Sequence, residues 1–401
     1  MATVSPRRVV GRRRFLQQSA LVSTAWLLPS FLKAMGPGLP GGQRRLVVLQ
    51  LSGGNDGLNT VVPFRHDVYA ANRKSLALPK DRLHLLTDDV GLNPGAAGLR
   101  ALYDEGLLSI VQGIGYPDTD RSHFRSLDIW HTASASNEYL ETGWLGRYLD
   151  HDCSAPHEVI EVGPSLTLAN KGERLKAITL TDANRLYRST REPYFAQLAQ
   201  HGEHQHRTAA YLYKTMAETY QSAAYLKEKL KTSEAFMGYA KDELGKQLRT
   251  VANFIKSGFD TRAYYVSLSG FDTHGNQLQR HERLLKSVGD NLLSFVNDLK
   301  AAGELDSTVV MVFSEFGRRV KQNASKGTDH GAAGPLFLVG GGLKKPGLFN
   351  AMPSLDDLDT NGDLKFSVDF RSVYASVLRD WLGTDPANII PGAVPVPGLI
   401  G

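Results

Sequence analysis

The chain has 401 residues, of which 42% are hydrophobic and 22% are charged, an ordinary globular composition with ample length for a large core. The formal net charge of +5 comes from the first 34 residues, which hold six basic side chains and no acidic one; without them the net charge is −1. The remainder therefore argues against a nucleic-acid-binding protein, and the single cysteine excludes an internal disulfide framework.

Residues 1–34 are expected to be an export signal. Three consecutive arginines, Arg12 to Arg14, are followed by Phe-Leu and then by an apolar run over residues 20–32. The run is shorter than the ~20 residues of a spanning helix, so no spanning helix is expected in the mature chain. The pattern resembles a twin-arginine signal, which implies recognition by the twin-arginine translocation machinery and a periplasmic or otherwise exported location. Ala34 is a candidate cleavage position, and an uncleaved anchor stays open.

A glycine- and proline-rich linker is expected over residues 35–44, and the first strand of a domain over residues 45–51. The strand runs into Ser-Gly-Gly-Asn-Asp56-Gly. A strand followed by two glycines and an aspartate indicates a metal- or phosphate-binding turn, although it lacks the lysine of a P-loop. The alternative is a tight turn that uses its glycines and asparagine at positive φ.

Residues 107–115 are predicted to form a second strand, which leads into a loop dense in reactive groups. Ser122, or Thr119 in its place, is a candidate nucleophile, with Arg121 and His123 as partners for an anion. The alternative is an ordinary solvated polar loop.

The character of the chain changes over residues 192–257. Apolar and aromatic residues recur there at helical spacing with charges between them, which predicts a helical hairpin or cap inserted into the domain.

Three apolar runs in the C-terminal third lie next to polar clusters. Asp272 and His274 follow one run, Glu315 follows the next, and His330 precedes the third. Ligands bind beyond the carboxyl ends of strands in open α/β sheets, and two clusters lie at such ends. Carboxylate and imidazole side chains gathered in this way indicate a metal-assisted site. The alternative for any one of them is a helix cap or a satisfied polar group.

The helical pattern over residues 277–299 joins two of these strands, which predicts a βαβ unit and parallel pairing. The fold class expected is α/β, with a mixed, mostly parallel sheet flanked by helices.

Taken together, the motifs resemble the bacterial exported family called domain of unknown function 1501. They are Ser-Gly-Gly-Asn-Asp56, Arg121-Ser-His-Phe, Gly143-Trp-Leu-Gly-Arg-Tyr, Asp272-Thr-His-Gly, Ser314-Glu-Phe-Gly-Arg and Asp329-His-Gly. That family is distantly similar to the alkaline phosphatase and sulfatase superfamily. The resemblance covers residues 45–401 and implies an alkaline phosphatase-like core with the helical insertion at about 192–257.

The resemblance also implies a reaction and a site. A divalent metal (Zn, Mn, Mg or Ca) would assist the cleavage of a small anionic phosphate or sulfate ester. The metal ligands implied are Asp56, Asp272, His274, Glu315 and His330. The resemblance implies Ser122 as the nucleophile, with Thr119 as the alternative. In such a reaction Arg121 or Arg318 would pair with the ester oxygens, and His123 stays the anion partner that its loop indicates.

Two departures from the superfamily pattern favour a second interpretation. The aspartate and histidine of one ligand pair are separated here by a single residue, and Glu315-Phe316 stands where the superfamily has Asp-His. The alternative is therefore a non-catalytic exported binding or assembly protein that keeps the fold and a structural metal.

Overall fold

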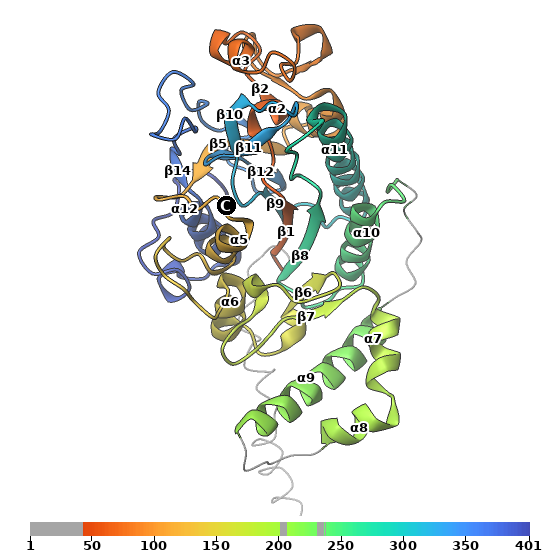
Figure 1. Ribbon diagram of the computed structural model, residues 1–401. Helices are drawn as coiled ribbons and strands as arrows, with labels where there is room; N and C mark the ends of the chain where they lie inside the picture. The colour runs from red at the N-terminus through yellow and green to blue at the C-terminus, as the bar shows by residue number, and fades with distance from the viewer. Residues whose placement is uncertain (1–42, 201–206, 231–235, 237) are drawn as a thin grey trace, which may run out of the picture. The chain divides into compact units, whose positions relative to one another are not determined.

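The computed structural model describes residues 43–200, 207–230, 236 and 238–401 (Figure 1). The export signal predicted over residues 1–34 lies outside these residues, as does the linker up to residue 42. Residues 43–401 form one unit of the chain. No helix in the described part is long and apolar enough to cross a membrane.

A nine-stranded sheet runs through the middle of this unit. Its order is β13-β5-β12-β9-β1-β8-β6-β7, and β14 also pairs with β5. Two smaller sheets have the orders β2-β4-β3 and β10-β11. The strands are β1 (Arg45–Ser52), β2 (Val61–Val62), β3 (His84–Leu85), β4 (Gly91–Leu92), β5 (Leu108–Gly115), β6 (Val159–Val162), β7 (Ile178–Leu180), β8 (Ala263–Ser269), β9 (Thr308–Phe313), β10 (Arg318–Gln322), β11 (Thr328–His330), β12 (Gly334–Gly340), β13 (Gly347–Leu348) and β14 (Val368–Asp369).

The central strand β1 is a run of leucine and valine that is buried on both faces, as parallel strands covered by helices are. It pairs in parallel with β8 on one side and β9 on the other. Strand β12 is antiparallel to both β5 and β9. The carboxyl ends of β5, β9, β1 and β8 therefore lie at one edge of the sheet, together with the amino end of β12.

Helices cover both faces of the sheet (Figure 1). Helices α4, α10 and α11 pack on one face in a core that includes Leu248 and Phe295, and α5, α6 and α12 pack on the other around Trp130 and Trp144. The helices are α2 (Gly57–Thr60), α3 (Asp67–Asn72), α4 (Ala97–Asp104), α5 (His123–Thr132), α6 (Trp144–Asp152), α7 (Ala183–Thr190), α8 (Pro193–Gln200), α9 (Arg207–Lys229), α10 (Glu243–Lys256), α11 (Gln277–Ala301), α12 (Phe370–Ser376) and a π-helix (Val377–Leu382).

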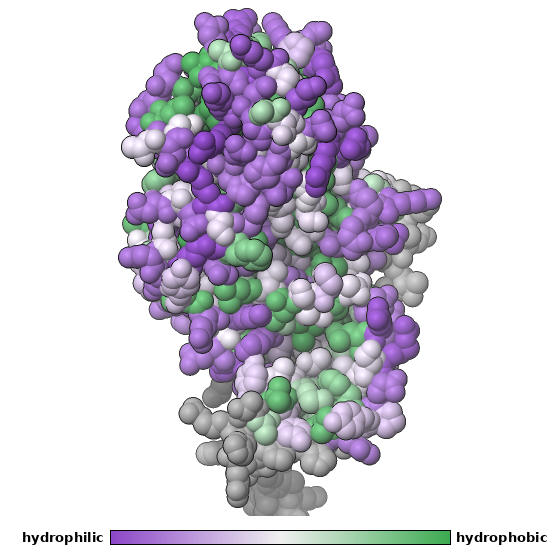
Figure 2. All heavy atoms as spheres, viewed as in Figure 1, coloured by the Kyte–Doolittle hydropathy of each residue, from purple (hydrophilic) through white to green (hydrophobic). Residues whose placement is uncertain are grey.

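The insertion predicted over residues 192–257 has two parts. Helices α8 and α9 extend from the sheet with α7, and they carry exposed apolar side chains such as Tyr194 and Leu212 (Figure 1). Hydrophobic residues also show on the surface of this part in Figure 2, whereas the opposite end of the molecule is mainly hydrophilic. Helix α10, in contrast, buries one face against β8 and α11.

The predicted fold class is confirmed: the sheet is mixed, mostly parallel and flanked by helices. The polar loops that follow β1, β5, β8 and β9 are thereby gathered at one edge. The antiparallel direction of β12 brings the residues before that strand, including His330, to the same edge.

Candidate metal centre

Asp272 lies in the loop that follows β8, between two buried residues, Phe271 and Thr273. Its carboxylate is 46% exposed and is the point on which the neighbouring groups converge. Oδ1 lies 2.7 Å from Nη2 of Arg318 and 3.0 Å from Nε2 of His274. The loop therefore presents a charged carboxylate at the carboxyl edge of the sheet.

His123 is the first residue of α5, directly after the loop that follows β5. Its Nδ1 lies 2.9 Å from Oε1 of Glu315, a fully buried carboxylate that can only accept, so Nδ1 is the donor. Nε2 lies 3.5 Å from Oδ2 of Asp272 and has no hydrogen-bond partner among the described residues.

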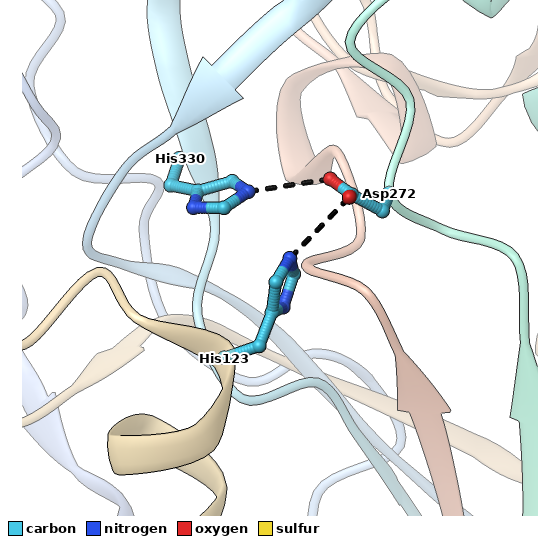
Figure 3. A group of neighbouring side chains, drawn as sticks. All are labelled: His123, Asp272 and His330. Atoms are coloured by element: carbon cyan, nitrogen blue, oxygen red, sulfur yellow. Dashed lines mark hydrogen bonds and ion pairs between the residues drawn. The ribbon is translucent and has the colours of Figure 1, made fainter.

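His330 ends β11, where the β10–β11 hairpin pairs it with Arg318. Its Nδ1 donates to the carbonyl of Arg121 at 2.7 Å. Nε2 is thereby turned toward Asp272, whose Oδ1 lies 3.2 Å away (Figure 3).

His274 adds a third imidazole from the loop that carries Asp272. Its Nδ1 lies 3.2 Å from Oδ1 of Asp329, and its Nε2 lies 2.9 Å from Nε2 of His330. All three rings thus have Nδ1 next to a hydrogen-bond acceptor and Nε2 near the carboxylate of Asp272.

This arrangement fits a divalent metal ion. A histidine that binds a metal through one nitrogen almost always donates its other N–H to a carboxylate or a carbonyl. With Nδ1 protonated, a neutral imidazole has a lone pair and no proton at Nε2. His274 and His330 then bring two lone pairs within 2.9 Å, a contact that a cation between them would stabilise. One ligand atom each from His123, Asp272 and His330 lie within 4.8 Å of one another (Figure 3).

The protonation of the site follows from the same contacts. The hydrogen bond to Glu315 raises the pKa of His123 against the opposing effect of burial. Burial lowers the pKa of His330, and the Arg121 carbonyl only partly offsets this. For Asp272 partial burial favours the neutral form, but the hydrogen bond and charge of Arg318, together with the neighbouring imidazoles, outweigh it and lower the pKa to about 2. Asp272 is therefore an anion and His330 is biased toward its neutral form, as metal ligands must be.

Glu315, predicted as a ligand, is not part of the group of His123, Asp272 and His330, but it contacts the His123 ring. Oε1 accepts from the backbone N–H of Gly53 at 2.8 Å as well as from His123, and Oε2 lies 3.1 Å from the hydroxyl of Ser314. The structure therefore gives its carboxylate the position of a support for the His123 ring.

Asp56, also predicted as a ligand, lies outside that group. Its carboxylate is fully buried, forms an ion pair with Arg73 at 2.6 Å and accepts from Gln277 and from the backbone of Asn59. Burial opposes ionisation, but the charge and hydrogen bond of Arg73 lower the pKa of Asp56. The structure thus shows Asp56 as the N-cap of α2 and an internal ion-pair partner.

The predicted catalytic residues take different positions. Arg318 is buried and donates to the carbonyls of Gly53, Gly54, Phe271 and Thr328 and to Asp272, so it organises the loops around the centre. Ser122 is exposed at the N-cap of α5, next to His123, and its hydroxyl forms no hydrogen bond in the described part.

The side chain of Arg121 is directed to an ion pair with Asp363, 2.5 Å away. The alternative nucleophile, Thr119, donates its hydroxyl to the carbonyl of Tyr116.

Three contacts of the site had weak signals in the sequence, or none. His123 was predicted as an anion partner, whereas its Nε2 faces Asp272 as a ligand would. Asp329 supports His274, and its place directly before His330 was the available signal. The pairing of Arg73 with Asp56 had no signal, since Arg73 follows α3 in an otherwise ordinary helical segment.

Solved structures that resemble the chain include three with the following descriptions. One is the lipoteichoic acid synthase LtaP from Listeria monocytogenes, at 11% identity and a TM-score of 0.43, over 88% of this chain and 75% of that one. A second is the phosphonate monoester hydrolase SpPMH from Silicibacter pomeroyi, at 10% identity and a TM-score of 0.42, over 88% and 76%. A third is a protein in the alkaline phosphatase superfamily from Vibrio parahaemolyticus, at 10% identity and a TM-score of 0.33, over 76% and 61%.

No curated protein matches the chain. The sequence profile of one family does, and it is described as a protein of unknown function (DUF1501). The match covers residues 104–391, which include His123, Asp272, His274 and His330. The chain therefore belongs to the DUF1501 family.

Proposed function

We propose that the chain is an exported, metal-dependent hydrolase of phosphate or sulfate esters. The observation that carries the proposal is the convergence of three imidazole Nε2 atoms on Asp272, each ring having its Nδ1 next to a hydrogen-bond acceptor. Such support is typical of metal-ligating histidines and is not needed by surface histidines.

The donor set indicates the kind of metal. Imidazole nitrogen suits Zn²⁺ and other transition metals, whereas Mg²⁺ and Ca²⁺ prefer oxygen ligands. We therefore expect Zn²⁺ or a similar transition-metal ion, held by His123, Asp272, His274 and His330. A bound ion of this kind lowers the pKa of a coordinated water and neutralises charge that develops on an ester oxygen.

The chain itself would contribute a nucleophile and a binding site for the anion. Ser122 precedes His123 at the N-terminus of α5, a ten-residue helix whose dipole favours an anion at that end. The free, exposed hydroxyl of Ser122 supports it as the nucleophile that attacks the ester. Arg318 is unsuited to bind the ester directly because its guanidinium is buried among backbone carbonyls.

A second candidate function, a non-catalytic binding or assembly protein with a structural metal, is also favoured by an observation. Both arginines predicted to pair with the ester are engaged within the protein, Arg318 with carbonyls and Arg121 with Asp363. An ester hydrolase usually keeps at least one guanidinium or other donor aimed at the transferred group.

The deciding experiment is metal content by mass spectrometry, on protein exported and purified without chelators. We expect about one ion per chain in wild type, and a loss in Asp272→Ala and in His330→Ala. His151→Ala is the matched control, because His151 is an exposed histidine that pairs with its neighbour Asp152. No metal in a folded wild-type protein would contradict both candidate functions.

Turnover on a panel of phosphate and sulfate esters then separates the two. For a hydrolase, turnover should require the ion, and Ser122→Ala should abolish it while the ion stays bound. A stoichiometric ion with no turnover on any ester would favour the binding protein. Turnover that survives in Ser122→Ala would remove the nucleophile role from Ser122.

A further inference from the structure

Asp363 is a fully buried carboxylate in the segment between β13 and β14, outside the metal centre. Its Oδ2 lies 2.5 Å from Nη2 of Arg121, and its Oδ1 lies 3.8 Å from Nε of Arg319. Neither oxygen has a hydrogen bond that meets normal geometry. An ionised carboxylate without contact to water is costly unless it is paired, so these two guanidiniums supply the compensating positive charge for Asp363.

Arg121 connects this buried pair to the metal centre through its backbone. The Arg121 carbonyl accepts the hydrogen bond from Nδ1 of His330 at 2.7 Å. Other hydrogen bonds of the loop lie within it, such as those from Thr119 to Tyr116 and from the Ser122 amide to Asp120, or come from Ser136, whose hydroxyl donates to the carbonyl of Pro117. They shape the loop but do not fix its position relative to the β10–β11 hairpin.

Arg319 provides the second connection, from the other side of His330. It follows Arg318 on β10, and Arg318 is the residue that pairs with His330 across the hairpin. Asp363 therefore contacts one side chain from each of the two segments between which His330 is held.

We propose that Asp363 is a positioning residue for His330. By holding Arg121 it fixes the carbonyl that keeps the His330 proton on Nδ1 and leaves the Nε2 lone pair free. The effect on proton placement stands on the hydrogen-bond geometry alone, and only its consequence for metal affinity rests on the proposed function.

The test compares Asp363→Asn with Asp357→Asn. Asparagine keeps the shape of the buried side chain and removes the nearer of the two carboxylate charges beside Arg121; the other, Asp359, lies 3.9 Å away. Asp357 belongs to the same segment, but it is exposed and pairs with Lys365, so its variant controls for a general loosening of the segment.

The first readout is made on metal-free protein with ¹⁵N-labelled histidine. Long-range proton–nitrogen correlation spectra show which ring nitrogen of His330 carries the proton. We expect the Nδ1–H form in wild type and in Asp357→Asn, and a mixture with the Nε2–H form in Asp363→Asn. A His330 that stays in the Nδ1–H form in folded Asp363→Asn would overturn the proposal.

The second readout is the Kd for Zn²⁺, together with the visible spectrum of the Co²⁺ form. We expect Asp363→Asn to weaken Zn²⁺ binding about tenfold, at the low end of the effect of residues that support metal ligands. The Co²⁺ spectrum should change in the same variant. Equal Kd values and equal spectra in wild type and Asp363→Asn would contradict the proposal, as would an equal loss in Asp357→Asn.

If Asp363→Asn does not fold, Arg121→Lys tests the same link from the other partner. Lysine keeps the charge but lacks the planar fork, so we expect a partial shift of the His330 proton to Nε2. An unchanged proton position there would overturn the proposal. If wild-type protein binds no metal, the proposed function fails, while the position of the His330 proton still decides the role of Asp363.

Discussion

Glu315 contacts the candidate metal centre through the His123 ring. Its Oε1 accepts from Nδ1 of His123 and from the Gly53 amide. Glu315→Gln keeps one acceptor and loses the charge, so we expect the Kd for Zn²⁺ to rise about 10- to 100-fold, the usual effect of losing such a partner. A competition titration against a chromophoric chelator measures it.

Glu304→Gln is the control for that titration. Glu304 also pairs closely with a buried partner, Arg45, but at the opposite end of β1. Equal Zn²⁺ affinity in Glu315→Gln and wild type would show that His123 does not depend on Glu315, or that it is not a ligand.

His131 is a buried histidine whose protonation should change the free energy of unfolding as the pH changes. Its Nε2 lies 2.9 Å from Oε1 of Gln50, and burial lowers its pKa to about 4. In the unfolded chain the pKa is about 6.5. Between these pH values the unfolded state binds the proton and the folded state does not. The free energy of unfolding therefore keeps the whole contribution of neutral His131 above pH 6.5 and loses it as the pH drops to about 4. The difference amounts to about 3 kcal/mol.

His131→Gln removes this titration. Urea unfolding at pH 7 and pH 4.5 should show a smaller loss of stability for the variant than for wild type. Parallel losses in the two proteins would mean that His131 is charged in the folded state or is not buried.

For single residues, the sequence predicted which carboxylate and imidazole side chains lie at the carboxyl edge of the sheet. It did not predict which other side chains they contact there. Asp272, His274 and His330 could be found because each adjoins a predicted strand and a glycine. Their roles as ligands stay a prediction. Asp56 and Glu315 have the same local signals, yet the structure surrounds them with Arg73 and His123, which come from distant segments. Such partners depend on tertiary packing and leave no mark in the local pattern.

Among the elements, the contact between α4 and α11 depends on two glycines. A Cβ at Gly98 would lie 2.2 Å from the backbone oxygen of Gly289, whereas a Cβ at Gly289 would lie 3.2 Å from the amide of Leu99. Gly98→Ala should therefore push the helices apart and lower the free energy of unfolding by about 1–3 kcal/mol, the usual cost of overpacking.

Gly289→Ala is the matched comparison for Gly98→Ala. The chemical change is the same, but the added Cβ meets a looser contact than at Gly98. Alanine also favours a helix over glycine by about 1 kcal/mol. We expect a smaller loss in chemical denaturation, or none. Equal losses for the two variants would mean that the helices relax around either side chain.

The elements themselves were easier to predict than their directions. The runs that became β1, β5, β8 and β9 are short, apolar and bounded by polar or glycine residues, which is why the parallel core could be predicted. That β12 runs against its two neighbours could not, since strand direction is set by the connection through the β10–β11 hairpin and by pairing with β5. The position of α10 could not be predicted either. Its apolar pattern resembles that of the other helices of the insertion, yet its apolar face packs on the sheet.

For the whole molecule, every residue of the candidate centre belongs to the unit that begins at Gln43. A chain that starts at Gln43 should therefore unfold in one cooperative transition and bind the same number of metal ions as the full chain. Calorimetry with and without a chelator measures both. A chain from Gln43 that folds but binds no ion would show that residues 1–42 contribute to the centre.

The three segments that carry His123, Asp272 and His330 meet only after the strands before and after them have paired. In a chain with a single cysteine, an ion held by all three would act as a cross-link that closes very long loops of the polypeptide. The metal would then bind only after the chain has folded. The twin-arginine pathway, which the sequence of residues 1–34 predicts, carries chains that are already folded. The ion would then be acquired before export, from the metal supply of the compartment where the chain is made.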